Sequence, residues 1–479
     1  MFKVLFAAAV LASQTAPPST PPSAPSPAAS RLDLARCYLA FERAMDERPP
    51  LAEARRPINE AIDRLTMFFF AGKNNEAIAA LNETTASVLG IDGDARATFL
   101  ALASQQAVFE PRDVIAGATP TVRCTFSPLI AHRGLPEGST YIVTAPDGST
   151  LAQPASGVLR LHDGDAARPG RYEISMTAAG SPRSVVIGSV CVLHRDAAAT
   201  AVDLAKRLDA LDAKNSTREA DRAATRSRVA LLTSAASKSA AFLADRSVLE
   251  SEVSREVAEL ERDQSPWIGR RGEAWRTVRF DGADFPVRVL IPEAVGAGTR
   301  PPLIIALHGF GGDENMFLTG YGNGLLGRLA REKNFVVACP VTGNLSTSQK
   351  LFDAIVQEMV TCVDIDRSRV FLLGHSMGAN AAARIAAARG DEIAGVVLIA
   401  GPGIVDTSGP DSPLQRTPPR LIVRGGIDPI ARAAPGPYGL STKVYPDEGH
   451  LLVVGRSLPD VVNWILEQKP LDAATQRTD

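Results

Sequence analysis

The spacing of hydrophobic residues changes several times along the chain, and each change predicts a different kind of element. From Arg31 to about Glu110 the apolar residues recur every three or four positions, which is the period of an amphipathic helix. One predicted helix face carries Leu34, Tyr38, Phe41 and Met45, and a second carries Ile58, Ile62, Leu65 and Phe69. We therefore expect residues 31–110 to form a helical region.

Residues 111–195 follow a period of two instead, which predicts strands. The clearest are 139–145 and 184–192, and together they indicate a small β domain with a sandwich-like arrangement. Helical spacing returns in residues 196–265, with a seam of Leu249, Val253, Val257 and Leu260. Near-balanced charges elsewhere in this segment favour a helical hairpin that packs on its own chain over a membrane or nucleic-acid element.

Residues 266–479 alternate short apolar runs with amphipathic stretches. A run that is apolar throughout is typical of a parallel strand buried on both faces. Such runs occupy residues 302–307, 335–339, 370–373, 395–400 and 421–424, and helices are expected at 351–363 and 460–467. Two further runs, 276–280 and 286–291, flank the hairpin signal Asp281-Gly282. The pattern predicts an α/β domain whose mostly parallel sheet opens with an antiparallel pair.

The first residues of the chain differ from all of these segments. Met1–Ala12 carry one positive charge, Lys3, followed by an apolar run, which is the pattern of a short secretory signal peptide. The run is too short to cross a bilayer, so no integral membrane span is expected. Residues 13–30 are rich in Pro, Ser, Thr and Ala and predict an extended linker. We expect a secreted or periplasmic protein, with a disordered cytosolic tail as the alternative.

The composition adds a few constraints. A chain of 479 residues, 45% of them hydrophobic, can build the cores of several domains. The formal net charge of −2 shows no excess of positive charge of the kind that binds DNA or RNA, so no nucleic-acid partner is expected. Five cysteines leave at least one unpaired, and Cys124 and Cys191 could form a disulfide in an exported protein. No Cys-x-x-Cys or His-rich cluster indicates a metal, so we expect no metal and no cofactor; the oligomeric state is not determined by the sequence.

A Gly-x-Ser-x-Gly pentapeptide, Gly374-His375-Ser376-Met377-Gly378, joins a predicted strand to an Ala-rich helical stretch. In this context a serine is forced onto a strained turn with its hydroxyl pointing outward. The two glycines remove β-carbons where strand and helix crowd the turn. The pentapeptide alone is a weak signal, because a chain of this composition can contain it by chance. A catalytic interpretation therefore depends on the segments around it.

Upstream of this pentapeptide, the apolar run 302–307 leads directly into His308-Gly309-Phe310-Gly311-Gly312. Backbone amides in such a loop can stabilise the negative charge that develops on a carbonyl oxygen when a serine attacks the acyl carbon. Taken by itself, the loop could equally be a glycine-rich turn without chemistry. Its position ahead of the serine turn favours the catalytic interpretation.

A serine hydroxyl needs a base within hydrogen-bonding reach, and the base needs an acid that orients it. Asp428 lies in a turn after the run 421–424, and His450 follows the next short strand. Asp406 and Asp411 follow the preceding strand and are alternative acids. The turn of Asp428 and its distance before His450 resemble the commoner arrangement in hydrolases with such a serine turn, so we prefer Asp428.

The other histidines and the charges next to His450 have plainer interpretations. We expect surface or turn positions for three histidines and buried imidazoles, bonded to the backbone, for the two inside the motifs. The first three are His132, His162 and His194, and the other two are His308 and His375. Asp447 and Glu448 are expected to be solvated loop charges.

Together these motifs resemble the α/β-hydrolase family over about residues 275–468. The resemblance implies Ser376 as nucleophile, Asp428 as acid and His450 as base, in the chain order of that family. It also implies an oxyanion hole formed by the amides of Phe310 and Met377. The segment around Ser376 is similar to esterases grouped with polyhydroxybutyrate depolymerases, feruloyl esterases and dienelactone hydrolases, although the last use cysteine where this chain has serine.

The resemblance implies a serine esterase that cleaves a small-molecule or polymer carboxylic ester through an acyl-enzyme, and the N-terminal segment adds the expectation that it is exported. One alternative is a prolyl-oligopeptidase-like peptidase, although residues 31–265 are too short and too helical for the β-propeller of those enzymes. Another is a carbohydrate- or surface-binding protein with an inactive hydrolase domain. Residues 401–419 are too few for a folded cap, so any lid must come from the N-terminal half or from a partner.

Overall fold

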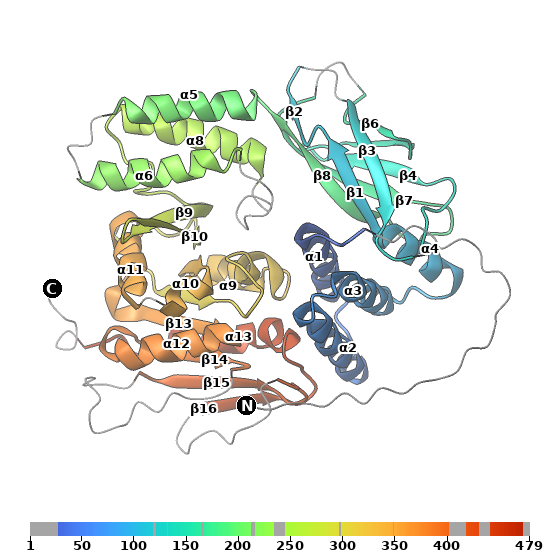
Figure 1. Ribbon diagram of the computed structural model, residues 1–479. Coiled ribbons are helices and arrows are strands. Elements are labelled where there is room, and N and C mark those ends of the chain that lie inside the picture. Colours follow the sequence, from blue (N-terminus) through green and yellow to red (C-terminus); the bar gives the residue numbers. More distant parts are fainter. Residues whose placement is uncertain are drawn as a thin grey trace, which may run out of the picture.

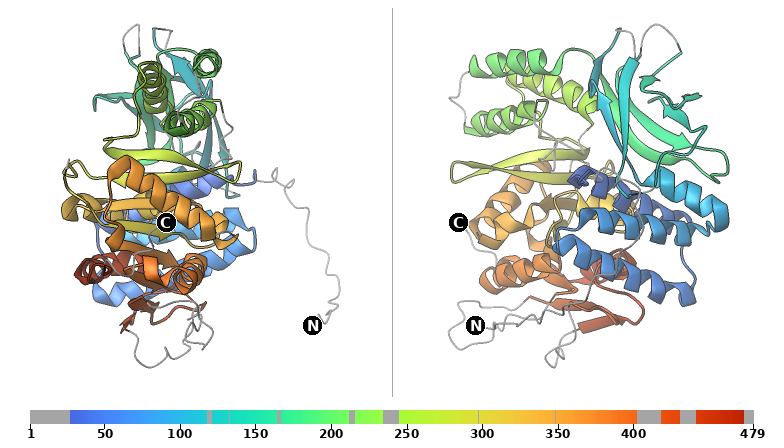
Figure 2. Two further views of the ribbon diagram at one scale, coloured as in Figure 1. Left: turned by 90° about the vertical axis from the view of Figure 1, so that its left-hand side faces the viewer. Right: turned by 45° about the vertical axis from the view of Figure 1, so that its right-hand side comes forward.

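The computed structural model describes residues 27–117, 121–131, 133–163, 167–211, 216–233, 245–296, 298–347, 349–401, 418–430 and 441–472. The expected signal peptide and most of the expected linker lie outside these residues. Two small sheets and a layer of helices lie at one end of the molecule, and a large C-terminal sheet lies at the other (Figures 1 and 2). The first helices of the chain lie beside the large sheet and below the two small sheets in the view of Figure 1.

The N-terminal helical region contains α1 (Arg31–Glu47), α2 (Ala52–Phe70), α3 (Asn74–Leu89) and α4 (Gly93–Ala103). Ser30 caps α1: its side chain accepts the Asp33 amide, and the Asp33 carboxylate accepts the Ser30 amide. The apolar faces expected from the sequence pack against one another, with Phe41, Ile62 and Leu81 at the centre. Burial of this shared apolar surface holds the first three helices together.

Residues 105–193 form two small sheets that share one core. The three-stranded sheet has the order β1-β3-β6, with β1 (Gln105–Glu110), β3 (Thr121–Pro128) and β6 (Val158–Arg160). The five-stranded sheet has the order β2-β8-β7-β4-β5, with β2 (Asp113–Ile115), β4 (Thr140–Thr144), β5 (Thr150–Pro154), β7 (Gly170–Thr177) and β8 (Val185–Leu193). Val122 of one sheet and Ile174 of the other belong to the same cluster, as in a sandwich. Gln105–Glu110 is a strand where helix was expected, because it pairs along its whole length with β3.

Three described helices follow the sandwich, where the sequence predicted a two-helix hairpin. They are α5 (Ala197–Asp209), α6 (Ser216–Ala230) and α8 (Arg246–Glu261). The face that α6 buries mixes polar and apolar residues: Asp221, Thr225 and Arg228 are at most 3% exposed, as are Ala224 and Val229. Arg228 lies over the indole of Trp267 and pairs with Glu256 at 3.1 Å. Buried charged groups interrupt the apolar face of this helix, which is why the sequence pattern indicated too few helices.

The C-terminal part is built on an eight-stranded sheet with the order β16-β15-β14-β13-β11-β12-β10-β9. Its strands are β9 (Gly272–Phe280), β10 (Ala283–Ile291), β11 (Leu303–Leu307), β12 (Val336–Pro340), β13 (Val370–His375), β14 (Gly395–Ile399), β15 (Arg420–Gly425) and β16 (Ser441–Tyr445). Asp281 and Gly282, with φ of 49° and 74°, join the antiparallel pair β9–β10. Strands β11 to β16 are parallel. The expected mostly parallel sheet is confirmed.

Helices cover both faces of this sheet. One face carries α11 (Gln349–Val363) and α12 (Met377–Ala388), and the other carries α9 (Leu325–Lys333) and α13 (Leu452–Glu467). The carboxyl ends of the parallel strands meet at one edge, which is where open α/β sheets place their ligand sites. Loops that follow these strands face α1 and α2 across a cavity. The N-terminal helices therefore lie over the edge at which the predicted site residues gather.

All five cysteines belong to the described residues and all are free thiols, so no disulfide joins Cys124 and Cys191. Among the described helices, none combines the length and the apolar character that a bilayer crossing requires. The described His, Cys, Asp and Glu side chains form no group of three or more that could hold a metal ion.

Candidate active site

Ser376 occupies a sharp turn between β13 and α12. Its backbone has φ 53° and ψ −114°, a conformation that a residue with a side chain rarely adopts. A Cβ at Gly374 would collide with the backbone of Gly378, and a Cβ at Gly378 would collide with that of Leu307. The Ser376 amide donates to the Ile399 carbonyl at 2.9 Å and so ties the turn to the neighbouring strand. Both glycines are required for the serine to stand at the end of β13.

Three of the predicted site residues lie in one hydrogen-bonded row. Ser376 Oγ is 3.0 Å from Nε2 of His450, and Nδ1 of His450 is 2.9 Å from Oδ2 of Asp428. His450 and Asp428 are each 3% exposed. The second carboxylate oxygen of Asp428 accepts the Ile430 amide at 2.8 Å. Because the carboxylate accepts from Nδ1–H, Nε2 remains as the acceptor for the serine hydroxyl.

The backbone of His450 is held from two sides. Its amide donates to Asp63 Oδ1 at 2.9 Å, and its carbonyl accepts from Nε2 of His375 at 3.0 Å. Nδ1 of His375 in turn accepts from the Tyr321 hydroxyl at 2.8 Å. Burial lowers the pKa of His375 to about 3, so this imidazole stays neutral and keeps its pattern of hydrogen bonds. His375 supports the position of His450 and is not a proton carrier.

The loop after β11 passes close to the serine turn. A Cβ at Gly309 would collide with the imidazole of His375, so only glycine permits this approach. His308 anchors the loop, because Nδ1–H donates to the Gly309 carbonyl at 2.8 Å and Nε2 accepts the Thr342 amide at 3.0 Å. Burial also lowers the pKa of His308. Like His375, it is a buried imidazole bonded to the backbone.

Of the two residues whose amides are predicted to form an oxyanion hole, Met377 directly follows Ser376 in the chain. Phe310 lines the same cavity as the serine. Met377 is the first residue of α12, and the first amides of a helix have no intrahelical acceptor. The Met377 amide and the amino end of the helix dipole therefore suit a developing negative charge beside Ser376.

Helix α2 contacts the His450 loop through two polar side chains. Asn59 Oδ1 accepts the Gly449 amide at 2.7 Å. The next amide of the loop, that of His450, donates to Asp63 as described above. A Cβ at Gly449 would collide with the Asp63 carboxylate, so the loop lies directly on the helix. Burial raises the pKa of Asp63 to about 6. No sequence motif marks Asn59 or Asp63 as a site residue.

Glu448 is not the solvated loop charge that was expected. It is 4% exposed, pairs with Arg55 at 3.0 Å and accepts a hydrogen bond from Asn59 at 3.0 Å. Arg55, Asn59 and Asp63 recur every four residues and so share one face of α2. That spacing was the only signal in the sequence, and it does not identify the loop to which the face binds.

The remaining candidates do not join this site. His162 and His194 belong to the region of the small sheets and do not line the cavity. His132 and the alternative acids Asp406 and Asp411 lie outside the described residues. Asp428 is the described carboxylate that reaches Nδ1 of His450.

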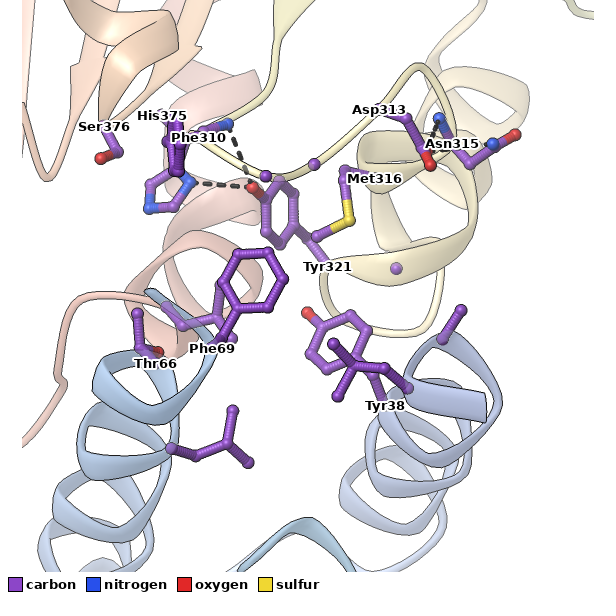
Figure 3. Close-up of a pocket in the computed structure, with 18 of the residues that line it drawn as sticks. Tyr38, Thr66, Phe69, Phe310, Asp313, Asn315, Met316, Tyr321, His375 and Ser376 are labelled. Carbon is purple, nitrogen blue, oxygen red and sulfur yellow. Dashed lines mark hydrogen bonds between the residues drawn. The ribbon is translucent and has the colours of Figure 1, made fainter. Parts of the chain in front are cut away.

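A cavity of about 490 Å³ opens beside Ser376. Loops of the C-terminal part form one wall, and helices α1, α2 and α3 form the other. Figure 3 shows Phe69 of α2 and Tyr38 of α1 facing this space, with Ser376, His375 and Tyr321 above them. The N-terminal helices α1, α2 and α3 thus supply a cover for the site, as expected for the N-terminal half.

Comparison with known proteins places part of this chain in a family. Residues 304–474 match the family model described as "Alpha/beta hydrolase family". No curated protein matches the chain. Among solved structures, FphF, a fluorophosphonate-binding serine hydrolase of Staphylococcus aureus, is similar at 16% identity and a TM-score of 0.33, over 41% of this chain and 100% of that one. An S-formylglutathione hydrolase of Agrobacterium tumefaciens shows 17% identity and a TM-score of 0.34, over 42% and 97%.

The matched residues run from β11 past the end of α13. They include the loop that carries Phe310, the serine turn, and the two segments that carry Asp428 and His450. The parallel strand order and the strained serine turn at the end of β13 agree with this match. Residues 304–474 of this chain are an α/β-hydrolase domain.

Proposed function

We propose that the protein is a serine hydrolase that cleaves carboxylic esters through an acyl-enzyme, with Ser376 as nucleophile, His450 as general base and Asp428 as the acid that orients it. The observation that carries the proposal is the hydrogen-bonded row from Ser376 through His450 to Asp428, at a strained turn that opens into a cavity. A nucleophile, a base and an orienting acid within hydrogen-bonding reach are what acyl transfer requires.

Acylation starts when Ser376 Oγ attacks the ester carbonyl carbon and Nε2 of His450 takes its proton. The carbonyl oxygen becomes an anion, which the amides of Phe310 and Met377 stabilise. Asp428 stabilises the imidazolium through Nδ1–H. When the tetrahedral intermediate collapses, His450 gives the proton to the leaving alkoxide, and the acyl group stays on Ser376. Water then attacks with His450 as base, which releases the carboxylic acid and restores the serine.

Ser376→Ala tests this assignment. We expect the variant to keep the circular dichroism spectrum of the wild type and to lose about 10⁴-fold or more in kcat on p-nitrophenyl butyrate. A fluorophosphonate should label the wild-type protein at Ser376 and leave the variant unlabelled. Unchanged turnover in the variant would exclude this serine as the nucleophile.

The two alternative functions predict other outcomes of the same assays. A prolyl-oligopeptidase-like enzyme would cleave a proline-linked chromogenic peptide and leave p-nitrophenyl acetate and butyrate intact. The described residues before β9 form helices and two small sheets, which does not favour that alternative. A carbohydrate- or surface-binding protein would retain a polysaccharide on an affinity column but take no label and hydrolyse no ester.

We also propose that the protein is exported, on the basis of the apolar run in Met1–Ala12 and the Pro-rich segment after it. Expression of the full chain in a bacterial host should place the protein outside the cytoplasm, with its leader removed. Amino-terminal sequencing of the recovered protein checks this. A cytoplasmic product that begins at Met1 would contradict it.

A further inference from the structure

The cavity beside Ser376 is built from two distant parts of the chain. The hydrolase domain contributes Phe310, Tyr321 and Leu451 to its apolar lining. The N-terminal helices contribute Leu34, Tyr38, Leu65, Phe69 and Leu81. In Figure 3, the side chains of α1 and α2 enclose the space that extends from the serine between the two helices. The hydrolase domain alone lacks this second wall.

Direct contacts on both sides of the serine hold the helices in place. On the side of the loop after β11, a Cβ at Gly311 would collide with the ring of Phe69, so the ring rests on this glycine. Arg31 pairs with Asp313 at 3.0 Å at the start of α1. On the other side, α2 binds the His450 loop through Asp63. The wall is therefore formed before any substrate arrives, which lowers the ordering cost of binding.

The polar groups that line the cavity are engaged with neighbours. The hydroxyl of Tyr38 donates to Glu42 at 2.6 Å, and that of Tyr321 lies 2.8 Å from His375. The hydroxyl of Thr66 donates to the Ile62 carbonyl at 3.0 Å. The charged lining residues Arg31 and Asp313 form an ion pair with each other. The cavity offers few free hydrogen-bond partners, so a sugar or a charged acyl group would lose its hydrogen bonds to water without replacement. An apolar chain would instead bury its surface against apolar side chains.

We propose that α1, α2 and α3 form an acyl-binding pocket that selects esters of apolar acids with chains of medium length, roughly six to ten carbon atoms. This inference rests on the proposed function, because the pocket becomes an acyl pocket only when Ser376 is acylated. The acyl group remains on the serine after the alcohol has left, so it suits the enclosed side of the cavity. Leu65 and Leu81, 6% and 1% exposed, close that side.

Hydrolysis of p-nitrophenyl esters from acetate to laurate tests the pocket, with the alcohol held constant. Each added methylene that is buried should raise kcat/KM about three- to fourfold, up to roughly the octanoate, beyond which the gain should stop. A parallel series of acetate esters with alcohols of growing length should show a much weaker dependence. If the alcohol series carries the length dependence instead, the cavity binds the leaving group and the inference is wrong.

Two variants connect this dependence to the helices. Ala35 lines the cavity from α1, and Ala35→Trp should fill part of it and lower the ratio of kcat/KM for octanoate over acetate by about tenfold. Leu32→Trp is the matched control, because Leu32 lies on the same helix, is 45% exposed and does not line the cavity; its ratio should equal that of the wild type. Phe69→Ala should enlarge the space and move the preferred chain length upward.

The outcomes separate this inference from the function on which it rests. A wild-type protein that takes no fluorophosphonate label and cleaves no ester would overturn the proposed function. A protein that is labelled at Ser376 but shows no preference among acyl lengths would overturn the pocket alone. The acyl pocket would also be overturned if Phe69→Ala and Ala35→Trp both fold and both keep the dependence of kcat/KM on acyl length that the wild type shows.

Discussion

Ser376 carries backbone strain, with its φ of 53°. This conformation costs a residue with a Cβ roughly 1–3 kcal/mol, whereas glycine adopts it freely. Ser376→Gly and Ser376→Ala both remove the hydroxyl, but only the glycine variant relieves the strain. We expect Ser376→Gly to have a free energy of unfolding about 1 kcal/mol above that of Ser376→Ala, measured by urea titration. Equal values for the two variants would show that the turn stores no strain.

Asp63 should make stability depend on pH, because burial raises its carboxyl pKa to about 6. Between about pH 4 and pH 6 the folded protein keeps a proton that the unfolded chain has lost, so Asp63 lowers the free energy of unfolding as the pH rises through this window. Asp63→Asn keeps an acceptor for the His450 amide and removes the charge. The variant should therefore gain stability over the wild type from pH 4 to pH 7 in urea titrations. A difference that does not change with pH would contradict this account.

The row Ser376–His450–Asp428 could be predicted because each member lies in a local motif. Two glycines mark the serine, and the other two residues follow strand ends in the order that the fold requires. Asn59 and Asp63 could not be predicted in the same way. Their bonds to Gly449 and His450 span 390 and 387 residues and depend on how two regions that are distant in the sequence pack together.

Helix α2 docks on the loop after β11 through the contact between Phe69 and Gly311. The φ of Gly311 is 78°, and a Cβ there would collide with the Phe69 ring. Gly311→Ala therefore strains the loop and also pushes on α2. In a Phe69→Ala background only the backbone strain remains, so the loss of stability from Gly311→Ala should be smaller by about 1 kcal/mol in a double-mutant cycle. Additive losses would mean that the helix does not press on this loop.

The elements that the sequence predicted best are those whose burial is apolar. Leu303–Leu307 and Val336–Pro340 are buried at every position, and an uninterrupted apolar run in the sequence predicts a strand of this kind. The elements that differ from expectation are held by other means. Gln105–Glu110 is partly exposed and owes its strand conformation to pairing with β3, and α6 packs in part through Asp221 and Arg228. Hydrophobic periodicity carries no information about either kind of contact.

The boundaries between the hydrophobic clusters of the molecule differ from the boundaries at which the hydrophobic pattern of the sequence changes. The cluster that holds α1 to α3 together also contains Leu452, the first residue of α13 in the hydrolase part. Among the described residues, the clusters of the sandwich and of helices α5, α6 and α8 contain no buried residue of the hydrolase domain. The first three helices therefore belong structurally with the catalytic part, although α4, the two small sheets and helices α5, α6 and α8 separate the two in sequence.

This arrangement predicts that a group attached to Ser376 stabilises helices far away in the sequence. We would compare the protein phosphonylated by an n-octyl fluorophosphonate with the methyl adduct, using hydrogen–deuterium exchange. The octyl chain should fill the space between α1 and α2 and suppress their local opening, so amides of these helices should exchange more slowly in the octyl adduct. Peptides from β4 and β7 of the sandwich serve as an internal control and should exchange alike in both adducts. Equal exchange of α1 and α2 in the two adducts would show that these helices do not enclose the bound group.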